Sequence, residues 1–213
     1  MKKFFVIIAI LLATGFVTFK YLMQPKDLGV KRDSSLVATF KQRNNMSTTP
    51  TDKKVELNTD MTSDEVTAVF TLWQERDKNF PLRDVQIKFN NDGTAEAAGY
   101  LKIRNAINLA KNLGYSDSDI EKGKEYIKYI SGDLPFYVAG TGSMINNTIS
   151  LSPTNFQIAK VTVPETITTP ATALVTDIIK RRINEVGGAD IKEASIKAGT
   201  FHLQGSIPES IQY

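Results

Sequence analysis

The N-terminal segment constrains this chain more than any other part of it. Lys2 and Lys3 precede an uninterrupted apolar run over residues 4–19, and Lys20 follows it. A helix that crosses a bilayer needs about 20 mostly apolar residues, within a range of about 17–25. The run reaches that length if Lys20 extends its amine to the lipid headgroups. The segment therefore predicts that the rest of the chain is tethered to a membrane or exported across one.

Two interpretations of this segment remain open, an uncleaved anchor and a cleaved signal peptide. A signal peptide has an apolar stretch of about 7–15 residues followed by a small-x-small cleavage site. The best such site, Ala13-Thr14-Gly15, lies inside the apolar run, and none follows the run. The chain has no cysteine, which excludes a lipidated-cysteine anchor. A transmembrane anchor over residues 1–23 is the favoured interpretation.

The expected orientation rests on the position of the segment. Basic residues near the ends of an apolar run set topology, and here more of them follow the run than precede it. That count does not favour an external C-terminus. A short basic tail before a single apolar run is, however, the arrangement of a secretory signal. We therefore expect a single-pass protein of a cell membrane, with its C-terminal domain extracytoplasmic.

The remaining chain divides into a linker and one domain. Residues 24–60 are rich in Ser, Thr, Asn, Lys and Asp, and their apolar residues lack a period. This composition predicts a flexible linker, with a short strand at its end over residues 55–57. Residues 61–213 have the length of a single domain. The net charge of +3 is mild, and no basic face with interleaved aromatic residues is evident, so nucleic acid is not an expected partner.

Hydrophobic periodicity predicts an α+β domain with a mainly antiparallel curved sheet and packed helices. Thr62 and Glu65 form a capping-box pattern that starts a helix. Residues 85–89 alternate between apolar and polar, and an Asp-Gly turn leads to a return strand over residues 94–104. Further expected elements are helices at roughly 105–113, 117–130 and 171–186, strands at 134–140, 144–151 (interrupted by Asn146-Asn147) and 156–163, and a closing hairpin of strands 191–197 and 200–207.

Two hairpins in this scheme share a spacing of glycines. The pattern Gly93-Thr94-x-x-x-x-Gly99-x-Leu101 matches Gly199-Thr200-x-x-x-x-Gly205-x-Ile207, and each hairpin follows a predicted helix. A degenerate internal repeat would explain the match. Independent use of glycine at turns and bulges would explain it equally well, and the sequence leaves both explanations open.

Few residues carry catalytic or metal-binding chemistry. His202 is the only histidine, and its neighbours Phe201 and Leu203 are expected to point inward, which leaves His202 facing solvent. Without cysteine, a mixed His/Cys zinc site is not expected. Residues 140–143 (GTGS) follow a predicted strand but lack the lysine of a phosphate-binding loop, so they read as a polar turn. We expect no enzyme activity, no cofactor and no metal.

Several blocks of the domain resemble a known family. They are residues 80–89 (FPLRDVQIKF), 92–94 (DGT), 99–101 (GYL), 149–151 (ISL), 156–164 (FQIAKVTVP) and 199–208 (GTFHLQGSIP). Together they resemble bacterial membrane-anchored, extracytoplasmic proteins of the YpmS/LmeA-like kind, whose elongated α/β folds are related to the tubular lipid-binding superfamily. The predicted helices over residues 105–130 depart from that pattern.

The resemblance implies an apolar groove between a curved sheet and helices. Small inward residues would leave room for an acyl chain, and larger apolar residues would line it. The alternative is that all of these side chains fill a core. The candidate groove residues are Ala95, Ala97, Gly99, Phe136, Val138, Phe156, Ile158, Leu174 and Ile178.

Two hypotheses about the function therefore remain open. The first is a non-catalytic, membrane-anchored domain that binds lipid or another amphiphile in an apolar groove. The second is an interaction or assembly domain with an envelope or cell-wall partner and no small-molecule ligand. A continuous apolar channel favours the first, whereas a packed core with an exposed apolar patch favours the second.

Overall fold

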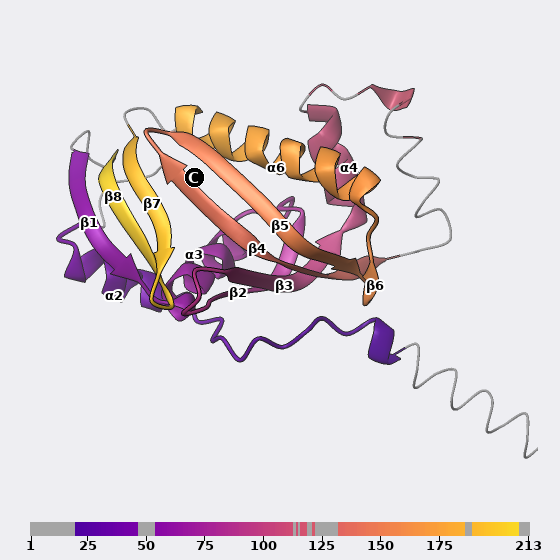
Figure 1. Cartoon of the computed structure of the whole chain (residues 1–213), viewed down its shortest axis with the longest axis horizontal. Coiled ribbons are helices and arrows are strands. Elements are labelled where there is room, and N and C mark those ends of the chain that lie inside the picture. The colour runs from indigo at the N-terminus through magenta and orange to yellow at the C-terminus, as the bar shows by residue number, and fades with distance from the viewer. Residues whose placement is uncertain are drawn as a thin grey trace, which may run out of the picture.

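The described part of the chain forms an α+β fold with an open, curved antiparallel sheet, which confirms the predicted class at this level (Figure 1). The computed structural model describes residues 20–46, 54–112, 114, 116–118, 121, 132–185 and 189–208. The strands are β1 (Lys54–Met61), β2 (Leu82–Phe89), β3 (Ala95–Lys102), β4 (Asp133–Ile145), β5 (Thr148–Ile158), β6 (Val161–Thr162), β7 (Asp190–Lys197) and β8 (Thr200–Pro208). The helices are α2 (Leu36–Arg43), α3 (Ser63–Arg76), α4 (Ile103–Asn112) and α6 (Glu165–Glu185).

Strand β4 organises the sheet because it pairs with three other strands. Its first part, residues 133–140, pairs with β3 on one edge, and residues 136–145 pair with β5 on the other edge. Beyond β3, Met144 and Ile145 pair with β7. The β2–β3 and β7–β8 hairpins therefore lie end to end along one edge of β4.

The two hairpins meet at their turns. A Cβ atom added at Gly199 would lie 2.7 Å from Oδ1 of Asn91, and the rings of Phe89 and Phe201 stack with centroids 5.6 Å apart. Gly99 lies opposite the register shift in β2, and Gly205 lies beside the register shift in β7. Each hairpin also follows a helix, α3 or α6. Glycines at turns and strand irregularities are expected under both explanations, so the internal repeat stays a prediction.

Helix α3 begins as its sequence predicts. The Thr62 hydroxyl accepts a hydrogen bond from the Glu65 amide, and the Glu65 carboxylate accepts one from the Thr62 amide, which completes the capping box. Three of its side chains satisfy backbone amides on the outer edge of β2: Gln74 at Asp84, Thr67 at Ile87 and Ser63 at Phe89. An edge strand covered in this way is protected from pairing with other chains.

Three predicted boundaries differ from the observed ones. Helix α6 begins at Glu165 rather than at residue 171, so Pro170 lies inside the helix, where it supplies no amide hydrogen for an intrahelical bond. The Thr168 hydroxyl donates to the Pro164 carbonyl at 3.2 Å in the first turn. Asn146 and Asn147, both at positive φ, turn β4 into β5 at the interruption that the sequence indicates. The predicted strand over 156–163 is divided, because β5 ends at Ile158 and Ala159-Lys160, both at positive φ, turn the chain into β6.

The third difference concerns residues 140–143, which were expected to be a turn. They lie inside β4, where Gly140 faces a register shift in the pairing with β5. A Cβ atom at Gly140 would lie 2.4 Å from the Ser152 carbonyl oxygen, so the glycine permits the close approach of β5. Glycine thus marks a strand irregularity here rather than the end of a strand.

The segment predicted to be a flexible linker, residues 24–60, is largely folded onto the domain. Residues 54–61 form β1, which pairs with β8 along its full length. Residues 24–33, called the strap below, run along the sheet toward α2 (Figure 1). Leu28, Val30, Val37 and Phe40 are buried, and these buried side chains explain why the polar composition does not make the segment a tether.

Two sequence predictions fall outside the described residues. The apolar run over residues 4–19 is one, and most of the predicted helix over 117–130 is the other. Within the part of the chain that the structure describes, no helix has both the length and the hydropathy to cross a membrane.

Candidate functional site

Seven of the nine predicted groove residues share one face of the sheet. In the register of β3, β4 and β5, Ala97, Val138 and Phe156 form one cross-strand row. Gly99, Phe136 and Ile158 form the next row, and Ala95 pairs with Gly140 on the same face. Cross-strand partners point to the same side with Cβ atoms about 4.5–5.5 Å apart. We call the surface made by these seven residues the apolar face.

Most of the apolar face is only half-buried. Val138, Phe156, Ile158, Ala95 and Ala97 all keep intermediate exposure. Phe136, with a relative exposure of 9%, and Gly99 are buried. Apolar side chains in a finished core are usually buried more completely than this, so the apolar face retains surface that can be covered further.

Farther along β4, the same side of the sheet is closed. Met144, Ile191 and Ala194 are buried there, and Ile179 and Ile183 from the C-terminal half of α6 pack against them. Phe201 and Leu203 join this cluster, as their expected inward orientation requires. This side of the sheet thus forms a filled core near β7 and β8, and near β5 and β6 it carries the partly exposed apolar face.

Helix α6 provides a wall beside the apolar face. It packs against β5 and runs along that strand from the β6 end of the sheet (Figure 1). The two remaining groove candidates, Leu174 and Ile178, lie within α6, ahead of the closed cluster. Their side chains fall outside what the structure describes, so their contribution to the groove remains a prediction.

Gly99 serves the backbone rather than a ligand. A Cβ atom at this position would lie 2.9 Å from the Arg83 carbonyl oxygen, 3.0 Å from the Val85 Cα and 3.2 Å from the Phe136 ring. The space that a side chain would occupy is already filled by the bulged part of β2 and by Phe136. Gly99 therefore shapes the sheet, while Ala95 and Ala97 keep the apolar face shallow.

The opposite face of the same strands is covered by the strap. Gln86, Ala98 and Tyr137 form a cross-strand row on that face. Leu28 and Val30 pack against Ala98 and Tyr137. The Gln86 side chain accepts a hydrogen bond from the Leu28 amide at 2.8 Å and donates one to the Val30 carbonyl at 2.9 Å. The strap thus covers this face through both apolar packing and hydrogen bonds.

An ionic network fixes the strap near its start. The Lys26 amine lies 2.6 Å from Glu96 Oε2, and the Tyr137 hydroxyl donates to the same oxygen at 2.7 Å. These hydrogen bonds, from Lys26 first and Tyr137 second, lower the pKa of Glu96 to about 2. Burial opposes the charge of Lys26, but its bonds to Glu96 and Tyr137 raise its pKa overall. Burial and the Glu96 carboxylate raise the pKa of the Tyr137 hydroxyl.

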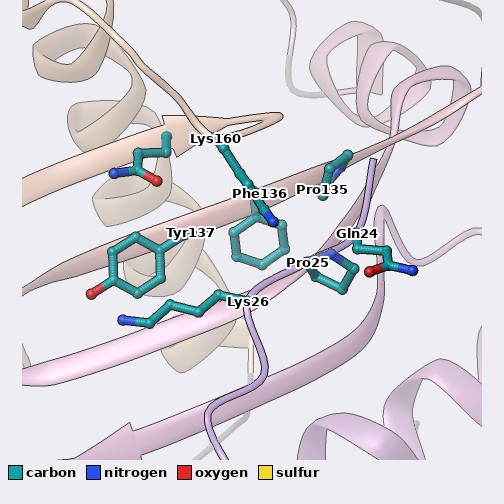
Figure 2. Close-up of a pocket in the computed structure, with 8 residues that line it drawn as sticks. Gln24, Pro25, Lys26, Pro135, Phe136, Tyr137 and Lys160 are labelled. Atoms are coloured by element: carbon teal, nitrogen blue, oxygen red, sulfur yellow. The ribbon is translucent and has the colours of Figure 1, made fainter. Parts of the chain in front are cut away.

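A shallow depression lies where the strap begins (Figure 2). Its empty volume is about 210 Å³ with open solvent included. Figure 2 shows Lys160 and Lys26 extending from its two sides, with Phe136 between them. The depression is too small for a whole lipid, since pockets for drug-sized ligands measure about 300–1,000 Å³. Its lining residues are Gln24, Pro25, Lys26, Pro135, Phe136, Tyr137, Gln157 and Lys160.

The described residues offer little for catalysis. No group of three or more His, Asp or Glu side chains among them could hold a metal ion. His202 is less exposed than expected, with a side-chain exposure of 21%, and its Nδ1 lies 2.9 Å from Asp60 Oδ1 across the β1–β8 pair. Asp117 pairs with Lys111 at 3.0 Å.

The strap is the functional element that the sequence interpretation missed. A signal for it exists, because Leu28-Gly29-Val30-Lys31 alternates between apolar and polar in the manner of a half-buried extended segment. The polar residues around Leu28 and Val30 dominate the composition of the segment, and the linker prediction rested on that composition.

The chain matches no family model and no curated protein. The assignment of a function therefore depends on the geometry of the apolar face and on the N-terminal segment.

Proposed function

We propose that this protein is a membrane-anchored, extracytoplasmic domain that holds lipid or another amphiphile against the apolar face, without catalysis. The observation that carries the proposal is the set of adjoining cross-strand rows on β3, β4 and β5. Ala97, Val138 and Phe156 form one row, and Gly99, Phe136 and Ile158 form the next. Most of these side chains keep partial exposure beside α6.

The energetics of acyl-chain binding suit such a surface. Each buried methylene contributes about 0.8 kcal/mol, so an acyl chain gains affinity from length without any polar contact. Half-buried side chains such as Val138 and Phe156 retain area that a ligand can cover. The filled cluster around Met144 sets the far limit of the apolar face.

Two features of the sequence support the same proposal. The apolar run over residues 4–19 would place the domain beside a bilayer, which is a source of amphiphiles. The resemblance to YpmS/LmeA-like proteins, carried by blocks that include residues 80–89 and 156–164, implies a lipid-binding fold.

A charge on the apolar face tests the proposal. Val138→Asp places a carboxylate in the middle row, where a bound acyl chain would have to desolvate it. The matched control is Thr141→Asp, because Thr141 is exposed and lies on the opposite side of the same strand. Both variants are made in a soluble fragment of residues 20–213, which keeps every described contact, and their folding is compared by circular dichroism.

The readout is uptake of a labelled phospholipid from vesicles into the soluble fragment. We expect the wild-type fragment and Thr141→Asp to take up lipid and Val138→Asp to lose most of this uptake. Equal uptake by a folded Val138→Asp variant would contradict the assignment of lipid to the apolar face. No uptake by any of the three would favour the alternative, a domain that binds an envelope or cell-wall partner.

A further inference from the structure

Two exposed apolar side chains gather at the end of the molecule where β5 turns into β6. Tyr21 is 62% exposed and Val161 is 65% exposed, which places both among the most exposed large apolar residues of the described chain. The amine of Lys160, in the turn between β5 and β6, lies 3.1 Å from the centre of the Tyr21 ring. Val161 follows Lys160 directly in the chain, and we call Tyr21, Lys160 and Val161 the tip.

The apolar face continues to this tip. Val161 pairs directly with Ile158 across the β5–β6 turn, and Ile158 pairs with Phe136 in β4. Because cross-strand partners share a face, Val161 extends the row of Phe136 and Ile158 outward. The row is buried at Phe136, half-buried at Ile158 and largely exposed at Val161.

The covalent chain fixes how far the tip can lie from the predicted anchor. The apolar run ends at residue 19, and Tyr21, which contacts Lys160, follows two residues later. Lys26 is already held by Glu96, so only residues 20–25 separate the run from a fixed point on the domain. Even fully extended, six residues span about 20 Å, and residues 20–22 are helical and therefore shorter.

The chemistry of the tip suits the surface of a bilayer. Aromatic side chains such as Tyr21 concentrate at the level of the lipid headgroups. A lysine near the surface of an anionic membrane contributes about 1 kcal/mol of attraction. Lys160 supplies such a charge, and Val161 supplies an apolar group that can enter the boundary between headgroups and acyl chains.

We propose that the tip, formed by Tyr21, Lys160 and Val161, rests on the bilayer that holds the N-terminal segment of the same chain, so that the apolar face opens onto the membrane. This inference rests on the proposed function for its anchor and its ligand. It adds a fixed orientation, in which the β5–β6 turn faces the membrane and the β4–β5 turn points away.

Site-directed spin labelling of the full chain tests this orientation. The chain has no cysteine, so a single Val161→Cys substitution can carry a nitroxide without further changes. The matched control is Ile145→Cys, because Ile145 is 61% exposed and ends β4 at the opposite end of the sheet. Both proteins are placed in nanodiscs containing phosphatidylglycerol, and collisions of the label with oxygen and with a water-soluble nickel complex are measured.

We expect collisions with the nickel complex to fall several-fold at Val161→Cys relative to Ile145→Cys, with oxygen collisions rising. Replacing phosphatidylglycerol by phosphatidylcholine, or adding Lys160→Glu, should weaken this protection. Equal access of the nickel complex at both positions would overturn the proposal, and so would failure of the chain to enter nanodiscs. Lipid uptake by the 20–213 fragment is independent of this readout, so a protected tip with no uptake would refute the lipid-binding function alone.

Discussion

The two faces of the sheet around β3 and β4 are built from alternate residues of the same strands, yet they differ in how far the rest of the chain covers them. On one face Ala98 and Tyr137 are covered by the strap, and Glu96 anchors the cover through Lys26. On the other face Val138 and Phe156 keep partial exposure. The strap covers the first face from within the chain, whereas the second face keeps apolar area exposed, and this is why the ligand is proposed to lie there.

The largest effect expected from this comparison comes from the strap. Leu28→Ala removes a buried side chain with a relative exposure of 7%, and we expect a loss of about 2–4 kcal/mol in the free energy of unfolding. Urea denaturation of the 20–213 fragment measures it. Val175→Ala on α6, where the side chain is 45% exposed, is the control and should change stability by less than about 0.5 kcal/mol. Equal effects would mean that the strap does not stabilise the domain.

A smaller effect is expected at the ionic anchor of the strap. Glu96→Gln removes the charge that binds Lys26 and Tyr137, and we expect a loss of about 1.5 kcal/mol at neutral pH. The folded-state pKa of Glu96 is lowered to about 2 from an ordinary value of 4.5. The unfolded chain therefore binds the proton more readily, so stability from Glu96 is present above about pH 4.5 and is lost as pH falls toward 2.

The pH dependence of Glu96→Gln provides the control for this assignment. Urea midpoints measured between pH 5 and about 2 should fall less steeply in the variant than in the wild type. Parallel curves would show that other carboxylates dominate the acid transition and would contradict the role given to Glu96.

The smallest effect is expected at the pair of His202 and Asp60. Asp60 has a side-chain exposure of 63%, and solvent screens such a pair strongly. We expect Asp60→Asn to cost no more than about 0.5 kcal/mol in the same denaturation assay. A loss as large as that of Glu96→Gln would remove the contrast between the partly buried Glu96 anchor and a surface pair.

The sequence predicted those parts of the fold that depend on local periodicity and on turn chemistry. The capping box at Thr62, the Asp-Gly hairpin and the turn at Ala198-Gly199 all appear where expected, because each is determined by a few neighbouring residues. Val138 and Phe156, both named as groove candidates from the sequence, form a cross-strand pair in the structure.

The parts that could not be predicted depend on contacts between distant residues. The strap is ordered by Gln86 and Glu96, which lie about sixty to seventy residues farther along the chain. The role of Gly99 follows from the bulge in β2 and from the ring of Phe136, neither of which its own neighbours reveal. Helix α6 contains Pro170, although proline disfavours the interior of a helix, and that local preference led the sequence interpretation to begin the helix at residue 171.

The central claim is that the apolar face holds a lipid, and the most direct test is mass spectrometry of organic extracts from the 20–213 fragment purified without detergent. Starting at residue 20 keeps the strap and its contacts with Ala98 and Tyr137. The account predicts a stoichiometric co-purifying lipid that is absent from an unrelated control protein. A clean extract, together with no uptake of added phospholipid, would contradict it.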